Sequence, residues 1–447
     1  LRNNEIKPIL GSCAISGYGV GEVLSFICNF APVHCEKGTI EVDGKTVETK
    51  DDAPFTGRVF KTVVDPFVGK ISYLKIMSGS LSLSTPLYNA NKDVNEKAGA
   101  LYVMCGKKQQ AVDKAYCGDI VALTKLSQTE TCDTLCTKDF VVKYPPIEYP
   151  RPMLGMAISP KTKDDEDKMS DALKKILIED KSINLVRNAE TGEQVLYCVG
   201  DQQLDVVVNK LKNRYKVEIN LKEPKVQYRE TIRGKSEVQG KYKKQNGGAG
   251  QFGDVWVRFE YNPDEEDLVF AEEVFGGAVP KNFFPSVEAG LRACMAKGPL
   301  AGCKVVNVKA TLYDGSYHPV DSKPNSFEAA AKLAFKNGIP KANPMILEPI
   351  GKVHVVTPEK YVGDLIGDFN KRRGMIMDTG HTDDGYTTID ADVPMAEMLK
   401  YATELRSMTK GRGTYVIDFD RYEPAPNSVA EKVIAAAAKD LKDDDID

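Results

Sequence analysis

The sequence predicts a multidomain α+β protein, in which an all-β barrel precedes two βαββαβ domains that flank an elongated α+β domain. The chain has 447 residues, which is too long for one compact core and fits three to five domains. Short strands broken by Gly, Pro and Asn fill residues 56–144, the pattern of an all-β barrel. One order of strands and helices occurs at residues 151–222 and again at 347–419.

Residues 1–34 are predicted to form the last strand and the last helix of a domain whose other elements are missing. Lys7–Leu10 is expected to be a short buried strand. The apolar residues of 20–30 fall on one face of a predicted helix that ends before Pro32. Residues 35–55 are polar and charged, so we expect a linker with a hairpin around Asp43-Gly44. The barrel is expected over residues 56–148.

Two ferredoxin-like domains are predicted, at residues 149–222 and 346–425, because both segments read βαββαβ. In the first, helices at 165–179 and 203–215 follow strands at 153–158 and 194–199, and further strands lie at 184–188 and 217–221. The second has helices at 358–371 and 395–409, with strands at 352–356, 374–379, 386–393 and 413–419. An alanine-rich helix and an acidic tail are expected at 426–447.

The elongated domain, residues 223–345, contains a basic, glycine-rich stretch at 241–254, KYKKQNGGAGQFGD. Predicted strands at 235–242 and 255–259 flank it, so it is expected to form a long hairpin that points towards an anionic partner. Composition alone favours an ordinary solvated hairpin. Gly248, Gly250 and Gly253 fit a dinucleotide-binding fingerprint, but a strand follows where that site needs a helix, so we reject it.

Composition limits the classes of function. The chain is 42% hydrophobic and 28% charged, as in globular proteins, and its net charge of −4 means that nucleic-acid binding needs local basic patches. The apolar runs are too short to span a membrane. Cys132 and Cys136 have no second pair or His nearby, so we expect no metal site, and the ten cysteines suit reduced thiols in the cytoplasm.

Nine motifs occur in a fixed order along the chain. They are Asp65–Lys70, Tyr228–Ile232, Gln245–Gly253, Lys297–Gly302, Gly315–His318, Leu347–Ile350, Gly363–Asp368, Arg372–Met375 and Leu405–Arg412. Together they resemble bacterial elongation factor G, the GTPase that drives translocation on the ribosome. The resemblance runs from Pro8 to about Ala438.

This resemblance implies a barrel of the translation-factor type, then third, fourth and fifth domains, after only the end of a GTPase domain. Ser12, Cys13 and Ala14 match the family's last guanine-contacting loop. The chain has no G-x-x-x-x-G-K-[ST] loop, so we expect no catalytic residue and no GTP hydrolysis by this chain. GTP and Mg²⁺ are expected as cofactors only of a longer parent.

The resemblance also implies that the fourth domain mimics a tRNA anticodon arm and enters the decoding site. The residues that match the contacts of its tip with tRNA and mRNA are Gln245, Asn246, Gly247, Gly248, His318, Pro319, Val320 and Asp321. The residues expected to contact phosphates and rRNA are Lys241, Lys243, Lys244, Lys371, Arg372, Arg373, Lys410 and Arg412. Arg229 and Glu230 are expected to form an internal ion pair. The expected partners are both ribosomal subunits, with the chain as a monomer and no membrane.

Departures from the family pattern keep other functions open. Asn246 and Asp254 stand where the family usually has Ser and His, and Gly200–Leu204 also differs. A paralogue that acts in ribosome recycling, or as a translocase for special conditions, would show such changes. A GTPase-free ribosome-binding protein is a second alternative, against which the partial domain at Leu1–Phe30 counts. A ribosomal protection factor that ejects an antibiotic is a third, and Ser316–Asp321 counts against it.

Overall fold

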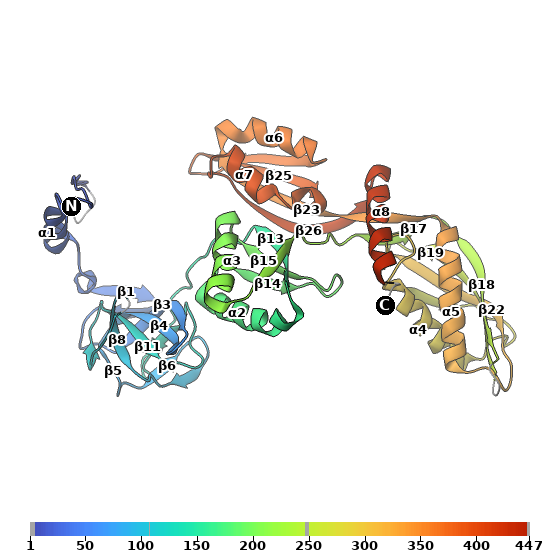
Figure 1. The fold of residues 1–447 in the computed structure, drawn as a ribbon, viewed down its shortest axis with the longest axis horizontal. Coiled ribbons are helices and arrows are strands. Elements are labelled where there is room, and N and C mark those ends of the chain that lie inside the picture. Colours follow the sequence, from blue (N-terminus) through green and yellow to red (C-terminus); the bar gives the residue numbers. More distant parts are fainter. Residues whose placement is uncertain (1–4, 107, 246–249, 445–447) are drawn as a thin grey trace. The chain divides into compact units, whose positions relative to one another are not determined.

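The computed structural model describes residues 5–106, 108–245 and 250–444 (Figure 1). It has two compact units: Leu1–Pro152, Ser159–Leu185 and Leu196–Asn220 form one, and Met153–Ile158, Val186–Val195 and Leu221–Asp447 form the other. Helices alternate with several separate sheets along the chain, which confirms the predicted multidomain α+β class. Within the described ranges, no helix is long and apolar enough to cross a membrane.

The N-terminal segment differs from its prediction in one respect. Helix α1 (Val20–Phe30) has the predicted bounds, but residues 7–10 form no strand and are exposed. A strand needs a neighbour for its backbone hydrogen bonds, and the pairing found in this part of the described chain is a single bridge between Cys13 and Tyr18. The apolar face of α1 is also uncovered, with Leu24 57% and Ile27 52% exposed.

The hairpin expected at Asp43-Gly44 is present, formed by β1 (Thr39–Val42) and β2 (Lys45–Glu48). Both turn residues have positive φ, 54° for Asp43 and 70° for Gly44, as a two-residue hairpin turn requires. The hairpin is not a free linker, because Val42 and Val47 are buried against Val142 and Tyr144. This part of the expected linker is therefore a packed element.

The predicted all-β domain is an eight-stranded sheet in the order β7-β6-β12-β3-β4-β11-β8-β9, with a further pair, β5 and β10. Its strands are β3 (Thr56–Asp65), β4 (Gly69–Ser78), β5 (Leu81–Ser82), β6 (Leu87–Asn89), β7 (Val94–Glu96), β8 (Leu101–Cys105), β9 (Lys108–Ala111), β10 (Lys114–Ala115), β11 (Ile120–Thr124) and β12 (Thr134–Cys136). Leu74, Leu123 and Leu135 lie in its single core. The sequence predicted the four longest strands, β3, β4, β8 and β11, and also β6, whereas the other short strands were not predicted because two to four residues show no clear alternation of apolar and polar side chains.

Residues 154–222 have the predicted βαββαβ order. The elements are β13 (Leu154–Pro160), α2 (Glu166–Glu179), β14 (Asn184–Arg187), β15 (Gln194–Cys198), α3 (Asp201–Tyr215) and β16 (Ile219–Lys222). Each helix buries the face that its 3.6-residue period predicts. Met169, Leu173 and Ile176 are buried on α2, and Leu204, Val207 and Leu211 are buried on α3.

The elongated domain is a four-stranded sheet in the order β18-β19-β22-β20, with two helices packed on one face. Its elements are β17 (Arg229–Ile232), β18 (Ser236–Lys244), β19 (Gln251–Tyr261), β20 (Val269–Glu272), α4 (Phe284–Met295), β21 (Lys304–Val305), β22 (Val308–Ser316) and α5 (Pro324–Gly338). Helix α5 lies directly on β18 and β19, and only glycine fits at the two closest points. A Cβ at Gly240 would be 2.1 Å from the Ala330 carbonyl oxygen, and one at Gly253 would be 2.3 Å from that of Ser326.

The C-terminal domain has a second βαββαβ order, as predicted. Its elements are β23 (Pro344–Pro358), α6 (Val362–Lys371), β24 (Met375–His381), β25 (Tyr386–Pro394), α7 (Tyr401–Met408) and β26 (Thr414–Pro424), followed by α8 (Asn427–Asp444). Strand β23 is 15 residues long and pairs first with β17 of the elongated domain, then with β25 and β26. The sequence predicted only residues 352–356 of this strand, since Pro349 and Gly351 indicate a break.

Candidate nucleic-acid interface

The tip of the elongated domain begins at the hairpin formed by β18 and β19. Along β18, Gly240 and Tyr242 face α5 and the core, so the alternation of a strand turns Lys241 and Lys243 to the other side. Lys241, Lys243, Lys244 and Gln245 are all exposed. Asn246, Gly247 and Gly248, which the sequence predicted to contact tRNA and mRNA, lie outside the described residues.

The second tip loop joins β22 to α5 and is closed by its own hydrogen bonds. The backbone N–H of His318 donates to Ser322 Oγ (2.8 Å), and the backbone N–H of Ser322 donates to the His318 carbonyl (3.1 Å). His318 Nδ1 accepts from the backbone N–H of Asp321 (3.2 Å). These bonds hold the turn compact while His318, Pro319 and Val320 stay exposed.

The second tip loop is bonded to the start of β19 (Gln251–Tyr261). The backbone N–H of Phe252 donates to the Asp321 carbonyl (3.0 Å), and Ser322 Oγ donates to the Phe252 carbonyl (3.0 Å). The Asp321 carboxylate lies over Gly250, where a Cβ would come within 2.8 Å of it. Asp321 is therefore half-buried against Gly250 and β19, while Gln245, His318, Pro319 and Val320 are exposed.

Below the loops, a buried carboxylate joins three strands. Asp254 is 6% exposed, and it accepts hydrogen bonds from Gln239 Nε2 on β18 (2.8 Å) and from Ser316 Oγ on β22 (2.7 Å). These bonds fix the register of the strands that carry the two loops. Sequence reasoning noted Asp254 only as a departure from the family, and its pairing with Ser316, 62 residues away, follows from the sheet and not from any local pattern.

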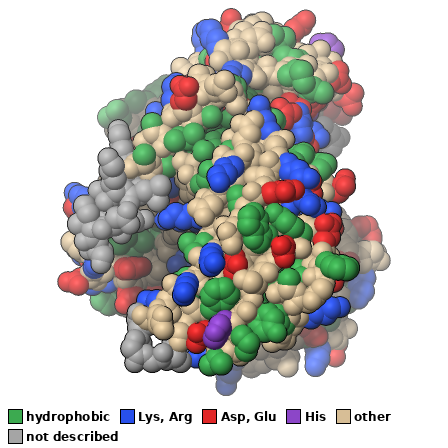
Figure 2. Space-filling view, turned by 90° about the vertical axis from the view of Figure 1, so that its right-hand side faces the viewer, with side chains coloured by type: hydrophobic (Ala, Val, Ile, Leu, Met, Phe, Trp, Pro, Cys, Tyr) green, Lys and Arg blue, Asp and Glu red, His purple; other side chains and the backbone are tan. Residues whose placement is uncertain are grey.

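Basic side chains alternate with acidic ones on the surface of the protein. Figure 2, which looks at the right-hand side of the view in Figure 1, shows Lys and Arg side chains among hydrophobic and acidic ones. Several cations of the elongated domain are neutralised by nearby carboxylates. Arg258 pairs with Glu237 (2.9 Å) and with Glu273 (3.1 Å), and Lys332 pairs with Glu328 (2.6 Å). For Lys241, Lys243 and Lys244, the contact found in the described chain is that of Lys241 Nζ, 5.8 Å from the centre of the Phe252 ring.

The consecutive basic residues Lys371, Arg372 and Arg373 of the C-terminal domain have different partners in the structure. Arg372 donates to Asp368 (2.7 Å) and Glu404, its guanidinium lies 5.0 Å from the Tyr401 ring centre, and its side chain is only 12% exposed. Arg373 makes a two-pronged pair with Glu348 (2.7 and 2.8 Å). These internal pairs raise the guanidinium pKa of both residues above its ordinary value, although burial opposes the shift, most strongly at Arg372.

The predicted phosphate contacts of Arg372 and Arg373 stay predictions, with the internal ion pairs as competitors. Both guanidinium groups already have carboxylate partners, and an RNA phosphate would have to displace them. Lys371, Lys410 and Arg412 are exposed, and for them an RNA contact stays a prediction.

The predicted ion pair between Arg229 and Glu230 is wrong, although both residues are internal. Arg229 pairs with Glu190 through two bonds of 2.7 Å and stacks on Tyr422, 5.0 Å from the ring centre. Adjacent residues on β17 point to opposite faces of the sheet, so these two side chains cannot meet.

Glu230 is the acceptor around which residues 298–303 fold. Its carboxylate accepts from the backbone N–H groups of Leu300 (2.9 Å), Ala301 (2.8 Å) and Cys303 (3.1 Å). Burial raises the pKa of Glu230, and these N–H donors act in the opposite direction. The loop approaches so closely that a Cβ at Gly298 would lie 2.4 Å from the carboxylate.

The remaining predicted site, Ser12, Cys13 and Ala14, lies in an exposed turn. The Cys13 backbone N–H donates to the Tyr18 carbonyl (2.9 Å), and a hydrogen bond with the Ser16 side chain lowers the pKa of the Cys13 thiol. Guanine contact by this turn stays a prediction. Among the residues that the structure describes, no three His, Cys, Asp or Glu side chains gather in a way that could hold a metal ion.

Comparison with known proteins gives matches along most of the chain. Residues 54–138 match the model of elongation factor G domain 2, 149–223 that of domain III, 224–343 that of domain IV and 345–433 that of the elongation factor G C-terminus. A crystal structure of a protein from Thermus thermophilus aligns with 94% of this chain at 35% sequence identity and a TM-score of 0.77. This chain spans 61% of that protein's chain.

Proposed function

On the premise that the chain belongs to the elongation factor G family, elongation factors of protein biosynthesis, we propose that it binds the ribosome and places its tip in the decoding site during translocation. The observation that carries this proposal is the attachment of the second tip loop to β19. This loop is joined to the start of β19 through Phe252, Asp321 and Ser322, next to strands whose register Asp254 fixes. The bonds hold the exposed His318 beside the basic end of β18 and β19.

The groups at the tip suit an RNA partner whose sequence varies. Lys241, Lys243 and Lys244 would pair with phosphates, which carry no sequence information. Gln245 and His318 present hydrogen-bonding groups that can reach 2′-hydroxyls and base edges. Such contacts would let one factor act on every tRNA–mRNA pair, with rRNA, tRNA and mRNA as its partners.

The hydrolysis of GTP is assigned in this proposal to a part of the parent protein that precedes these domains. The chain itself has no G-x-x-x-x-G-K-[ST] loop that could cradle the phosphates and help to hold Mg²⁺. The chain would therefore supply contacts with the ribosome, while the hydrolysis of GTP elsewhere in the parent protein would control when translocation occurs.

The tip lysines are expected to contribute a salt-dependent part of ribosome affinity. Replacing Lys241, Lys243 and Lys244 by Ala should lower the slope of log K against log salt concentration by about 2, since each phosphate contact contributes roughly 0.7–0.9. The measurement is the affinity of this chain for vacant ribosomes between low and physiological salt. The triple variant Lys281→Ala, Lys297→Ala, Lys341→Ala removes the same charge from exposed positions elsewhere in the elongated domain and should leave the slope nearly unchanged.

A second expected result separates the rate of translocation from the rate of GTP hydrolysis. In the full-length parent, Gln245→Ala combined with Asn246→Ala should slow translocation about tenfold, a loss of about 1.4 kcal/mol of transition-state stabilisation. Ribosome-stimulated GTP hydrolysis should stay close to the parent rate, because the tip does not touch the nucleotide in this proposal. Both rates are measured on the same ribosome complexes by rapid kinetics. A parallel fall of the two rates would show that these residues do not act at the decoding site.

A further inference from the structure

The sheet of the C-terminal domain has one face that α6 and α7 cover and an opposite face that they leave open. Val353, Val355 and Ile389 are buried on the covered side. We call the other side the open face. Residues directly opposite each other on neighbouring strands share a face, so the register places two rows of side chains there. The rows are Met375, Asp392, Lys352 and Asp418, and next to them Asp378, Asp390, His354 and Val416.

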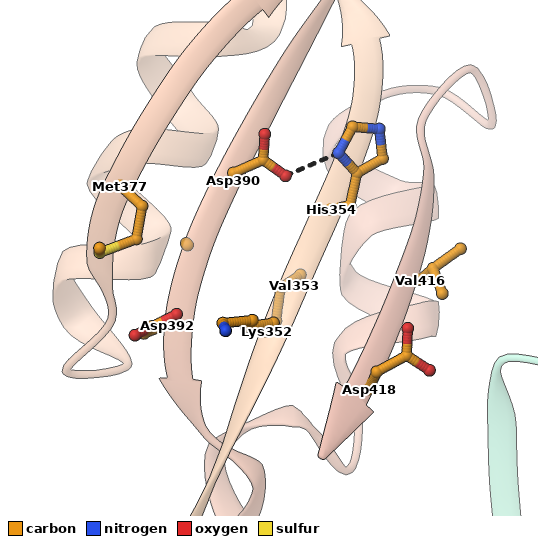
Figure 3. Close-up of a pocket in the computed structure, with 9 residues that line it drawn as sticks. Lys352, Val353, His354, Met377, Asp390, Asp392, Val416 and Asp418 are labelled. Carbon is orange, nitrogen blue, oxygen red and sulfur yellow. Dashed lines mark hydrogen bonds and ion pairs between the residues drawn. The ribbon is translucent and has the colours of Figure 1, made fainter. Parts of the chain in front are cut away.

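A hollow of about 320 Å³ lies between these rows (Figure 3). Met377 from β24 and Val416 from β26 stand at its two sides, and Ala391 belongs to its lining. Met377 is 58% exposed, as is Met375 on the same strand. Unbranched, polarizable methionine side chains adapt to the shape of a partner and are frequent at protein-binding surfaces.

The open face carries more carboxylates than cations. Asp390 pairs with His354 (2.7 Å), Asp420 with Lys352 (2.7 Å) and Asp392 with Arg421 (2.8 Å). Asp378 and Asp418 add two further carboxylates, so the two cations Lys352 and Arg421 stand against five aspartates. Asp378 and Asp390 are also direct partners across β24 and β25, and like charges in that position repel each other. An incoming positive charge would relieve this repulsion.

We propose that the open face is a docking surface for an extended, basic segment of a partner protein. Arg or Lys side chains of the segment would lie against Asp378, Asp390 and Asp418, and an aliphatic side chain would fill the hollow between Met377 and Val416. Segments of this kind are common in proteins that bind nucleic acids, where basic arms neutralise phosphates. The inference goes beyond the decoding-site proposal, since it concerns a protein partner and a different surface.

The negative charge of the open face favours a protein partner over an RNA partner. A phosphate backbone would meet the surplus of aspartates and be repelled, whereas a basic polypeptide gains from the same field. The exposed methionines and the hollow add apolar surface that a single cation would not use. A basic segment with alternating apolar residues matches both features.

The test uses the full chain and an acetylated, amidated octapeptide of alternating Arg and Val as the probe. Selective ¹³C labelling of the methionine methyl groups, with Met377→Leu to assign its signal, should show the Met377 resonance moving as peptide is added. Binding is measured in parallel by fluorescence anisotropy. The double variant Asp390→Asn, Asp418→Asn should weaken binding about tenfold, as expected for the loss of complementary charges in an interface.

A matched variant controls for general electrostatics. Glu359→Gln with Asp364→Asn removes the same charge from two exposed residues, one just before α6 and one in its first turn, on the covered side of the domain, and should change affinity less than twofold, as is typical of charges outside an interface. Equal weakening by both double variants would overturn the proposal in favour of diffuse attraction. A Met377 signal that does not move in the unaltered chain would also overturn it, whether or not the variants fold.

Discussion

Arg372→Ala is expected to destabilise the C-terminal domain by about 3–4 kcal/mol, because it removes the cation of a largely buried ion pair with Asp368. Asp368 would be left half-buried with no cation, since Arg372 is the partner that the structure gives it. The carbonyl of Glu397 would lose a donor, and the Tyr401 ring would lose the guanidinium stacked on it. The variant should therefore behave as a folding variant and not as a ribosome-contact variant.

The measurement is hydrogen exchange followed by mass spectrometry on the full chain. Peptides covering α6, α7 and β25 should lose roughly 10²–10³-fold in protection, which is the same free energy expressed as an opening equilibrium. Peptides of the barrel should be unaffected. Arg406→Ala, at an exposed position on α7, is the control and should change protection by less than about 0.5 kcal/mol. Unchanged exchange in Arg372→Ala would mean that the cluster does not hold this domain together.

Glu230→Ala is expected to lower the stability of the elongated domain by about 2–4 kcal/mol, because three backbone N–H groups lose their acceptor away from solvent. Leu300, Ala301 and Cys303 would have to find water or a new partner. The loop would loosen, and with it β21, which follows directly and pairs with β17. The charge on Glu230 is thus part of the fold, although its position beside Arg229 suggested a simple ion pair.

The chain has one tryptophan, Trp256 on β19, so its fluorescence reports on the elongated domain alone. Urea titrations of the full chain followed at Trp256 should show a lower midpoint for Glu230→Ala. The control is Glu237→Ala, which breaks exposed pairs with Arg258 and Lys235 and should cost less than about 1 kcal/mol. If the two variants have the same midpoint, the loop does not depend on Glu230.

Helices and strands whose apolar residues recur at regular spacing could be predicted from the sequence. The bounds of α1, the buried faces of α2 and α3, and both βαββαβ orders follow from local spacing of apolar residues, which needs no knowledge of the rest of the fold. The strand expected at residues 7–10 failed for the opposite reason. An apolar run becomes a strand only beside a partner strand, and the described chain offers it none.

The partners of charged residues could not be predicted in this way. Lys371, Arg372 and Arg373 look like one basic cluster, yet they have different environments. Arg372 meets Asp368, four residues earlier, and Glu404, 32 residues later, whereas Arg373 meets Glu348, 25 residues earlier. The carboxylate that each cation reaches is decided by which strands and helices pack together. The same holds for Asp254 and Ser316 at the base of the tip.

The continuous strand β23 has a mechanical consequence. It hydrogen-bonds to β17 over Pro344–Leu347, to β26 over Leu347–Val356 and to β25 over Ile350–Pro358. A force along this strand loads many ladder bonds at once in shear. Strand β17, the first strand of the elongated domain, should therefore resist being pulled away from the C-terminal sheet, whereas the sheet β18-β19-β22-β20 is not part of this ladder.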